Sequence, residues 1–253
     1  MVDSGHRTGS DKRGRKICVK KDKCTAILLA AGKGTRIGGK IPKQFMNILD
    51  KPVLYYSLEC FQNSPLIDEV ILVTAVDMIS YCRKHFSEKC GFTKVKHMIA
   101  GGAERYDSVY EGLKLCQDAD YVFIHDGARP FLTEEILWRG YEKVKSTGAC
   151  VAAVPSKDTI KLTDHGDRVR ETPNRDDVWI VQTPQVFLYD LIRSAYDRLQ
   201  DQDKSKITDD AAVLEKMGNH PVFVYEGSYK NIKITTAEDL ETAELFVRNV
   251  KKC

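Results

Sequence analysis

The sequence predicts an α/β protein built on a doubly wound, mostly parallel sheet, and two observations lead to this fold class. First, short apolar runs have the composition of strands covered on both faces: EVILVTA (69–75), YVFIHD (121–126) and CVAAVP (150–155). Second, such runs alternate with helical patterns of about 10–15 residues, as in βαβ units. Ligands of these sheets bind beyond the carboxyl ends of the strands. We therefore expect the functional residues at one edge of the sheet.

The elements follow from apolar periodicity and from turn and cap residues. Pro52 suits the first turn of a helix and Thr208 suits a helix N-cap. The expected strands are 26–29, 69–75, 94–100, 121–126, 150–155, 221–227 and 231–235, with a short extended piece at 45–49. The expected helices are 53–62, one near 77–89, one opened by 101–108 and reaching about 116, then 134–145, 188–200, 209–217 and 237–250. No linker or internal repeat is visible, so residues 24–253 are expected to form one domain.

Residues 157–180 break this pattern, because two polar, β-capable runs flank a His-Gly-Asp turn and have few apolar residues. A two-stranded hairpin is only marginally stable alone. One interpretation is an exposed solvent loop. The other is a protruding β-hairpin arm that docks on a second subunit, which makes the protein a dimer.

The charge is uneven along the 253 residues. Residues 1–24 hold eight Lys/Arg against three Asp/Glu, a local +5 that exceeds the net +3 of the whole chain. The basic balance therefore belongs to residues 1–23, expected to be a disordered basic tail, and predicts no nucleic-acid face on the domain. A transit peptide or an RNA-binding arm is the alternative for the tail. The tail contains no apolar segment like that of a secretory signal. No run in the chain approaches the roughly 20 apolar residues of a membrane span.

Eight cysteines are scattered without a CxxC pair, and the six histidines show no HExxH spacing. These spacings exclude the common zinc frameworks and give no reason to expect a metal held by protein ligands. The cysteines are expected to be reduced thiols of a cytoplasmic protein.

The stretch TAILLAAGKGTRIGGKIPKQ (25–44) brings glycines and cations into one loop after a strand. Glycine lets backbone N–H groups approach a polyphosphate closely, and lysine and arginine neutralise its charge. The dinucleotide fingerprint fails because Ile37 replaces its third glycine. The P-loop pattern also fits poorly, because Ile41 replaces the hydroxyl residue that holds magnesium.

LAAG (29–32), GTR (34–36) and PKQ (42–44) resemble the signature of cytidylyltransferases and other sugar-phosphate nucleotidyltransferases. Further motifs follow in order: GGAERYDSV (101–109), HDGARPF (125–131), KDTIK (157–161), NR…W…QTPQ.F (174–187), TDDA (208–211) and NIKIT..EDL (231–240). With them, the chain from about Cys24 to Val250 resembles the 2-C-methyl-D-erythritol 4-phosphate cytidylyltransferase family.

This resemblance implies that CTP and methylerythritol phosphate react to give a diphosphocytidyl-alcohol and pyrophosphate. It also implies Mg²⁺, held mainly by the CTP phosphates, and a homodimer whose arms are exchanged between active sites. No nucleic-acid or membrane partner is expected.

The resemblance also implies a role for each matching residue. The backbone that wraps the nucleotide is expected at Leu29, Ala30, Ala31, Gly32 and Gly34, with Arg36 and Lys43 on the triphosphate. The cytosine and ribose pocket is expected at Gly102, Arg105, Ser108, Asp126 and Gly127. The residues around the methylerythritol phosphate are expected to be Arg129, Thr183, Thr208 and Lys233. Thr159 and Arg175, on the arm, are expected to reach the partner's substrate phosphate. The catalytic cations are Arg36, Lys43, Lys233 and Arg175.

The chemistry agrees with these cations. The nucleophile is a phosphate oxygen that is ionised at neutral pH, so no side-chain base is needed. The barrier is repulsion between an anion and a triphosphate, which cations and Mg²⁺ lower. The nearest rival, a ribitol-5-phosphate cytidylyltransferase, tends to carry LAGG and lacks TDDA. A non-catalytic module of this fold would be expected to lose Arg36 or Lys43.

Simpler roles also remain open for several of these residues. Arg129 could cap a strand end, Asp126 could serve a helix N-terminus, Thr208 could be only an N-cap and Arg175 only a surface charge.

Overall fold

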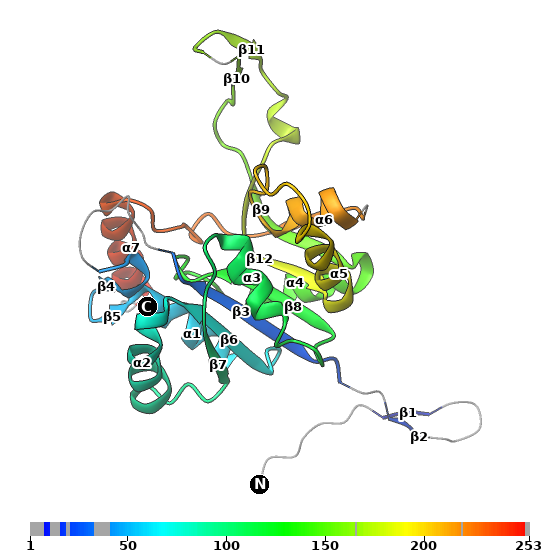
Figure 1. Ribbon diagram of the computed structural model, residues 1–253. Helices are drawn as coiled ribbons and strands as arrows, with labels where there is room; N and C mark the ends of the chain where they lie inside the picture. The colour runs from blue at the N-terminus through cyan, green and yellow to red at the C-terminus, as the bar shows by residue number, and fades with distance from the viewer. Residues whose placement is uncertain are drawn as a thin grey trace.

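The computed structural model describes residues 8–10, 16–18, 21–32, 41–164, 166–218 and 220–250. Within these residues, seven strands form one central sheet (Figure 1). In chain order they are β3 (Cys24–Ala30), β6 (Glu69–Thr74), β7 (Val95–Ala100), β8 (Tyr121–Asp126), β9 (Ala149–Pro155), β12 (Trp179–Leu188) and β13 (Phe223–Glu226). Their order across the sheet is β13-β9-β12-β8-β3-β6-β7.

Only β12 runs against its neighbours among these strands. It pairs antiparallel with β8 and β9, whereas β3 pairs parallel with β6 and β8, β6 with β7, and β13 with β9. The predicted fold class, a mostly parallel α/β sheet, is therefore confirmed. No strand was predicted at β12, because Pro184 and buried polar residues interrupt its pattern. The pairing of β12 with β9 shifts register between Val181 and Gln185, and Pro184 lies between these two residues.

Helices cover both faces because neighbouring strand residues point to opposite sides. In β3, Ala26 and Leu28 join a core with Leu58 and Ile136, whereas Ile27 joins a second core with Leu113. The first core receives α1 (Val53–Asn63), α2 (Ile79–Cys82) and α4 (Glu134–Thr147), and the second receives α3 (Arg105–Leu113), α5 (Tyr189–Leu199) and α6 (Asp210–Gly218). A smaller core joins α7 (Ala237–Val250) to β4 (Asn47–Ile48) and to Val53 at the start of α1, and β4 pairs antiparallel with β5 (Lys51–Pro52). The sheet is thus buried on both faces.

Three predicted elements differ from the structure in kind. The helix near 77–89 is a succession of η2 (Val76–Met78), α2 and a π-helix, η3 (Arg83–Lys89). The strand predicted at 231–235 is wrong. The backbone N–H of Ile234 donates to the carbonyl of Ala128, and the carbonyl of Asn231 accepts from the Arg129 side chain. This segment is therefore held by the turn after β8 instead of by a strand partner. The extended piece predicted at 45–49 is η1 (Lys43–Phe45) followed by β4.

The hairpin predicted within 157–180 is present. Strands β10 (Leu162–Thr163) and β11 (Val169–Glu171) pair antiparallel, and η4 (Arg175–Asp177) follows. The hairpin stands apart from the rest of the molecule (Figure 1). Its base is closed by the backbone N–H of Ser156, which donates to the carbonyl of Val178 at 2.8 Å.

The expected disordered tail, residues 1–23, lies mostly outside the described residues. Within it, β1 (Thr8–Ser10) pairs antiparallel with β2 (Lys16–Cys18). None of the described helices is long and apolar enough to cross a membrane. Six described cysteines are free thiols. Burial raises the pKa of Cys24, Cys116 and Cys150 to about 12, so these thiols stay protonated and unreactive at neutral pH.

Candidate active site

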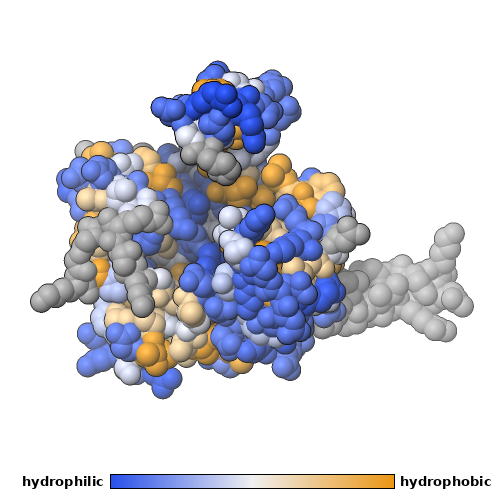
Figure 2. Space-filling model, turned by 45° about the horizontal axis from the view of Figure 1, so that its top comes forward, coloured by the Kyte–Doolittle hydropathy of each residue, from blue (hydrophilic) through white to orange (hydrophobic). Residues whose placement is uncertain are grey.

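A cavity among the described residues lies where the sheet changes its winding direction. After β3 the chain builds β6 and β7 on one side, and β8 then lies on the other side of β3. Loops leaving β3 and β8 therefore diverge, which opens a crevice at their carboxyl ends. The cavity there has a volume of about 770 Å³. Figure 2 shows a hollow below the arm, bordered largely by hydrophilic surface.

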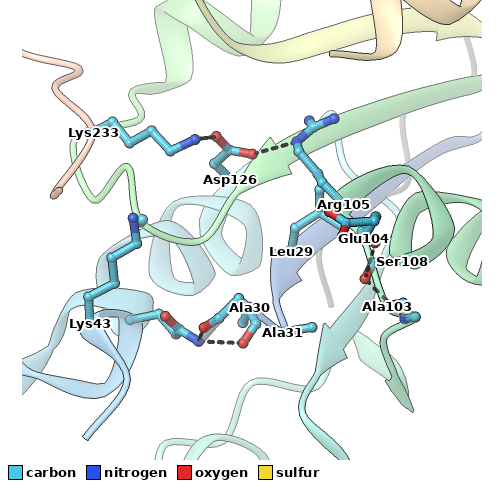
Figure 3. A pocket seen from close by; sticks show the side chains of 14 residues that line it. Leu29, Ala30, Ala31, Lys43, Ala103, Glu104, Arg105, Ser108, Asp126 and Lys233 are labelled. Carbon is cyan, nitrogen blue, oxygen red and sulfur yellow. Dashed lines mark hydrogen bonds and ion pairs between the residues drawn. The ribbon is translucent and has the colours of Figure 1, made fainter. Parts of the chain in front are cut away.

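Many of the residues predicted from the sequence meet in this cavity. Those that line it are Leu29, Ala30, Ala31, Gly32, Lys43, Gly102, Arg105, Ser108, Asp126 and Lys233. In Figure 3 Lys43 and Lys233 lie on one side of the cavity, and Ala103, Glu104 and Ser108 lie on the other. Residues that follow β3, β7 and β8 therefore line one crevice, as expected for residues at the carboxyl ends of parallel strands.

Gln44 shapes the cavity wall at the end of β3, although it was not predicted as a site residue. Its buried amide Nε2 donates to the carbonyls of Ala30 at 2.6 Å and Gly32 at 2.8 Å. The PKQ motif is thereby tied to the LAAG motif. These carbonyls are turned toward Gln44, which fixes the course of the backbone at the end of β3. The position of Gln44 beside Lys43 in the motif was the available signal.

The opposite wall is a tight turn into α3. The hydroxyl of Ser108 accepts from the backbone N–H of Gly102 at 3.1 Å and donates to the carbonyl of Glu104 at 3.2 Å. A Cβ on Gly102 would lie 2.3 Å from the Cβ of Asp107, so the turn requires glycine at this position. Ser108 is buried and holds the loop that forms the wall.

A row of alternating charges crosses the cavity wall. Lys233 Nζ lies 2.7 Å from Asp126 Oδ2, and Arg105 Nε lies 3.2 Å from Asp126 Oδ1 (Figure 3). Arg105 also binds Asp210 through Nη1 at 2.9 Å and Nη2 at 2.7 Å. Burial disfavours the ionised form of Asp126, but the charges of Arg105 and Lys233 outweigh it and hold the pKa of this carboxyl well below its ordinary value. Asp126 is therefore a carboxylate at any physiological pH.

Behind Asp126, a chain of hydrogen bonds fixes the end of β8. The hydroxyl of Thr183 accepts from the backbone N–H of Asp126 at 3.1 Å and lies 3.0 Å from His125 Nδ1. His125 Nε2 lies 3.0 Å from the carbonyl of Arg129, which can only accept. The imidazole therefore carries its proton on Nε2, and Thr183 donates to Nδ1. Burial lowers the pKa of His125 to about 4, so the ring is neutral at pH 7.

This buried imidazole predicts a pH dependence of stability. The pKa of His125 is about 4 in the folded chain and 6.5 ordinarily, so the unfolded chain takes up this proton first as the pH falls. The part of the unfolding free energy that depends on a neutral His125 is complete above about pH 6.5. Roughly 3 kcal/mol is lost as the pH falls toward 4. Urea unfolding at a series of pH values measures it. The depressed pKa of Asp126 acts only below its ordinary 3.8.

His125→Gln is the matched variant, because the glutamine amide can still donate to the carbonyl of Arg129 without titrating. It should flatten the stability profile between pH 6.5 and 4. An unchanged slope in this variant would remove His125 from the explanation.

Known proteins are similar to this chain in sequence and in fold. The family model described as IspD, 2-C-methyl-D-erythritol 4-phosphate cytidylyltransferase, matches residues 24–249. The chain belongs to this family. The enzyme of that name from Lachnoclostridium phytofermentans is 45% identical over 227 residues, which cover 90% of this chain and 97% of the relative. The one from Lachnospira eligens is 47% identical over 225 residues, covering 88% and 99%.

A solved structure agrees with these relatives. The 4-diphosphocytidyl-2C-methyl-D-erythritol synthase of Anaerococcus prevotii superposes with a TM-score of 0.77 at 33% identity, covering 90% of this chain and 100% of its own. The family is one of nucleotidyltransferase enzymes, so the alternative of a non-catalytic module of this fold is not favoured. The rival ribitol-5-phosphate enzyme is not favoured either.

Several residues predicted from the family pattern lie outside the cavity lining. Gly127 and Thr183 are buried behind it, and Arg129 donates from Nη1 to the carbonyl of Asn231 at 2.8 Å. Thr208 is exposed just before α6. Thr159 and Arg175 are exposed on the arm, where Arg175 Nη2 lies 3.4 Å from the Thr159 hydroxyl. Gly34 and Arg36 lie outside the described residues.

Arg129 and Thr183 therefore have supporting roles within one chain. Arg129 ties the turn after β8 to the segment that carries Lys233, and Thr183 holds Asp126. Sequence reasoning did not single out Asn231, whose buried amide donates to the carbonyl of Thr183 at 2.8 Å. Its place two residues before Lys233 in NIKIT was the only signal.

A divalent cation fits this cavity only with ligands from its substrate. The described residues contain no group of three or more His, Cys, Asp or Glu side chains arranged for a metal ion. The carboxylates lining the cavity are Glu104 and Asp126, and Asp126 is paired with two cations. Mg²⁺ is commonly bound through one or two carboxylates, substrate phosphates and water. This donor set fits such an ion.

Proposed function

We propose that this chain transfers CMP from CTP to 2-C-methyl-D-erythritol 4-phosphate, which yields 4-diphosphocytidyl-2-C-methyl-D-erythritol and pyrophosphate for isoprenoid biosynthesis. The observation that carries the proposal is the cavity at the β3 and β8 ends, where the family motifs meet and Lys43, Arg105 and Lys233 supply positive charge. The names of relatives at 45–47% identity support the substrates. The cavity is large enough for a nucleotide.

The positions of the residues in the cavity support the following proposed roles. The backbone from Leu29 to Gly32 is proposed to wrap the nucleotide, and the turn from Gly102 to Ser108 to hold cytosine and ribose. In Figure 3 Lys43 and Lys233 lie opposite that turn, which is where the triphosphate would then extend. The remaining nucleotide contacts proposed are Gly34, Arg105, Asp126 and Gly127, with Arg36 on the triphosphate.

In the reaction, an oxygen of the methylerythritol phosphate attacks the α-phosphorus of CTP. A bond forms between them, the bond to the bridging oxygen breaks, and pyrophosphate leaves with its electron pair. The nucleophile needs no base, because it is already an anion. Lys43 and Lys233 are proposed to stabilise the charge that spreads over the α-phosphoryl oxygens and the leaving group. Bound Mg²⁺ would neutralise further phosphate charge. The ion pair of Lys233 with Asp126 at 2.7 Å, which holds the lysine at the cavity, supports this proposed role.

We further propose that the arm completes the acceptor site of a second subunit, making the protein a homodimer. Thr159 and Arg175 do not line the cavity of their own chain, although the family pattern places them at the substrate phosphate. The arm base exposes apolar side chains at Trp179, Ile180, Val181 and Tyr229, with exposed fractions of 37–48%. Hydrophobic surface near the arm base is seen in Figure 2. A partner subunit would cover these side chains. Arg129, Thr183 and Thr208 remain proposed for the acceptor side.

Mixed dimers test the arm. Arg175→Ala and Lys43→Ala should each be inactive alone, and mixing the two unfolded chains and refolding them together should restore up to about a quarter of wild-type activity per chain. One site of each mixed dimer then has an intact Lys43 and receives an intact arm. Lys43→Ala mixed with itself is the control. Absence of recovery in dimers shown to be mixed would contradict an arm that acts in trans.

The function itself is tested by incubating the purified chain with CTP, Mg²⁺ and one polyol phosphate, and measuring pyrophosphate. Methylerythritol phosphate is expected to release pyrophosphate, and ribitol 5-phosphate to release far less. The reverse preference would replace the proposed substrate with the rival one. The cytoplasmic location expected from the cysteines stays a prediction.

A further inference from the structure

Asp210 is a buried carboxylate that reaches the cavity only through another residue. It is the first residue of α6, it is 0% exposed, and it does not line the cavity. Its oxygens accept from Arg105 at 2.9 and 2.7 Å and from the Tyr196 hydroxyl at 2.6 Å. Burial of an ionised carboxylate is costly, and here a bidentate guanidinium offsets that cost. The structure therefore places a fully buried carboxylate behind the cavity, outside its lining.

The two edges of the Arg105 guanidinium are held by different carboxylates. Nη1 and Nη2 face Asp210, and Nε faces Asp126 at 3.2 Å. A planar guanidinium bound along two edges has one orientation, unlike a lysine ammonium, which rotates freely. Asp210 is itself fixed from β12, because Gln185 Oε1 accepts from the backbone N–H groups of Asp210 and Ala211 at 3.0 Å each.

We propose that Asp210 is a positioning residue for the nucleotide: it holds Arg105 in the plane that presents this side chain, with Asp126, to the cavity. This inference rests on the proposed function, in which Arg105 contacts the nucleotide. It predicts that loss of the Asp210 charge weakens CTP use, although Asp210 touches no substrate.

Asp210→Asn is the test, with kinetics measured at a temperature where the variant is fully folded. KM for CTP is expected to rise about 10- to 100-fold, as when a group that orients a site residue is lost, with a smaller change in KM for methylerythritol phosphate. A merely structural role would lower the melting temperature and leave KM of the folded enzyme unchanged. A CTP KM within twofold of wild type would overturn the proposal.

Asp209→Asn is the matched control, since it removes the same charge one residue earlier. The Asp209 carboxylate accepts from Gln185 and from the backbone N–H of Ala212 and does not line the cavity. This variant should lose some stability at the start of α6 and keep its KM values. An equal rise of the CTP KM in both variants would assign the effect to the helix start instead of to Asp210.

If Asp210→Asn does not fold, Asp210→Glu keeps the charge and displaces it by one methylene. It should raise the CTP KM to an intermediate extent, and wild-type constants in this variant would contradict the proposal. A second readout needs no turnover. The Nε–H resonance of Arg105, assigned by its loss in Arg105→Lys, should exchange with water faster in Asp210→Glu or Asp210→Asn than in wild type. If the wild-type protein shows no turnover, the proposed function is wrong. If the Arg105 Nε–H exchanges with water at the same rate in the Asp210 variants as in wild type, the positioning role is wrong.

Discussion

Lys43→Ala is expected to lower kcat by about 10²- to 10³-fold, the loss typical of one preorganised charge donor at a transition state. Lys43 lines the cavity at the start of η1 and lies on the same side as Lys233 (Figure 3). Its charge should act most strongly when pyrophosphate is leaving, so the loss should appear in kcat more than in KM. The free energy of unfolding should change by less than about 1 kcal/mol, because Lys43 is only half-buried. Pyrophosphate release and urea unfolding measure the two effects.

Lys51→Ala is the control for this variant. Lys51 is a nearby lysine on β5 that pairs with Glu59 at 3.5 Å and lies over the ring of Tyr55, outside the cavity lining. Its removal should leave kcat unchanged. A Lys43→Ala enzyme with near-normal kcat would show that transition-state charge is stabilised elsewhere.

Asp126→Asn is expected to abolish measurable turnover and to lower the free energy of unfolding by about 2–3 kcal/mol. The substitution keeps the shape of the side chain but leaves Arg105 and Lys233 facing one another without the anion between them. The loss should be below that of a fully buried pair, because the side chains of Arg105 and Lys233 are 29% and 37% exposed. Urea unfolding at pH 7 gives the free energy of unfolding. Calorimetry shows whether the variant still binds CTP.

Asp164→Asn provides the comparison for stability. Asp164 pairs with Arg168 at 2.7 Å on the arm, where the arginine side chain is 86% exposed. Such a surface pair contributes at most about 1 kcal/mol. If Asp126→Asn cost no more than this control, the row of charges would have no part in holding the cavity wall together.

The strands with the clearest local pattern were predictable. β6, β8 and β9 are continuous apolar runs, and the structure buries nearly all of their side chains. β12 was missed for a physical reason. Gln182, Thr183 and Gln185 are buried in it, and their polar groups are satisfied by Ser228, His125 and residues 209–211. A periodicity argument treats such residues as exposed, because their partners lie far away in the chain.

The sequence by itself determined which motifs follow the parallel strands, and therefore that Leu29, Arg105 and Asp126 lie at one cavity. Strand composition and period are local properties, so they can be recognised without partners. Only the tertiary structure decided which charges pair. Lys233 with Asp126, and Arg105 with Asp210, join residues about a hundred positions apart. Such pairs depend on distances of a few ångströms between separate elements, which no local pattern contains. For the same reason, the supporting roles of Thr183, Asn231 and Asp210 became visible only once the chain was folded.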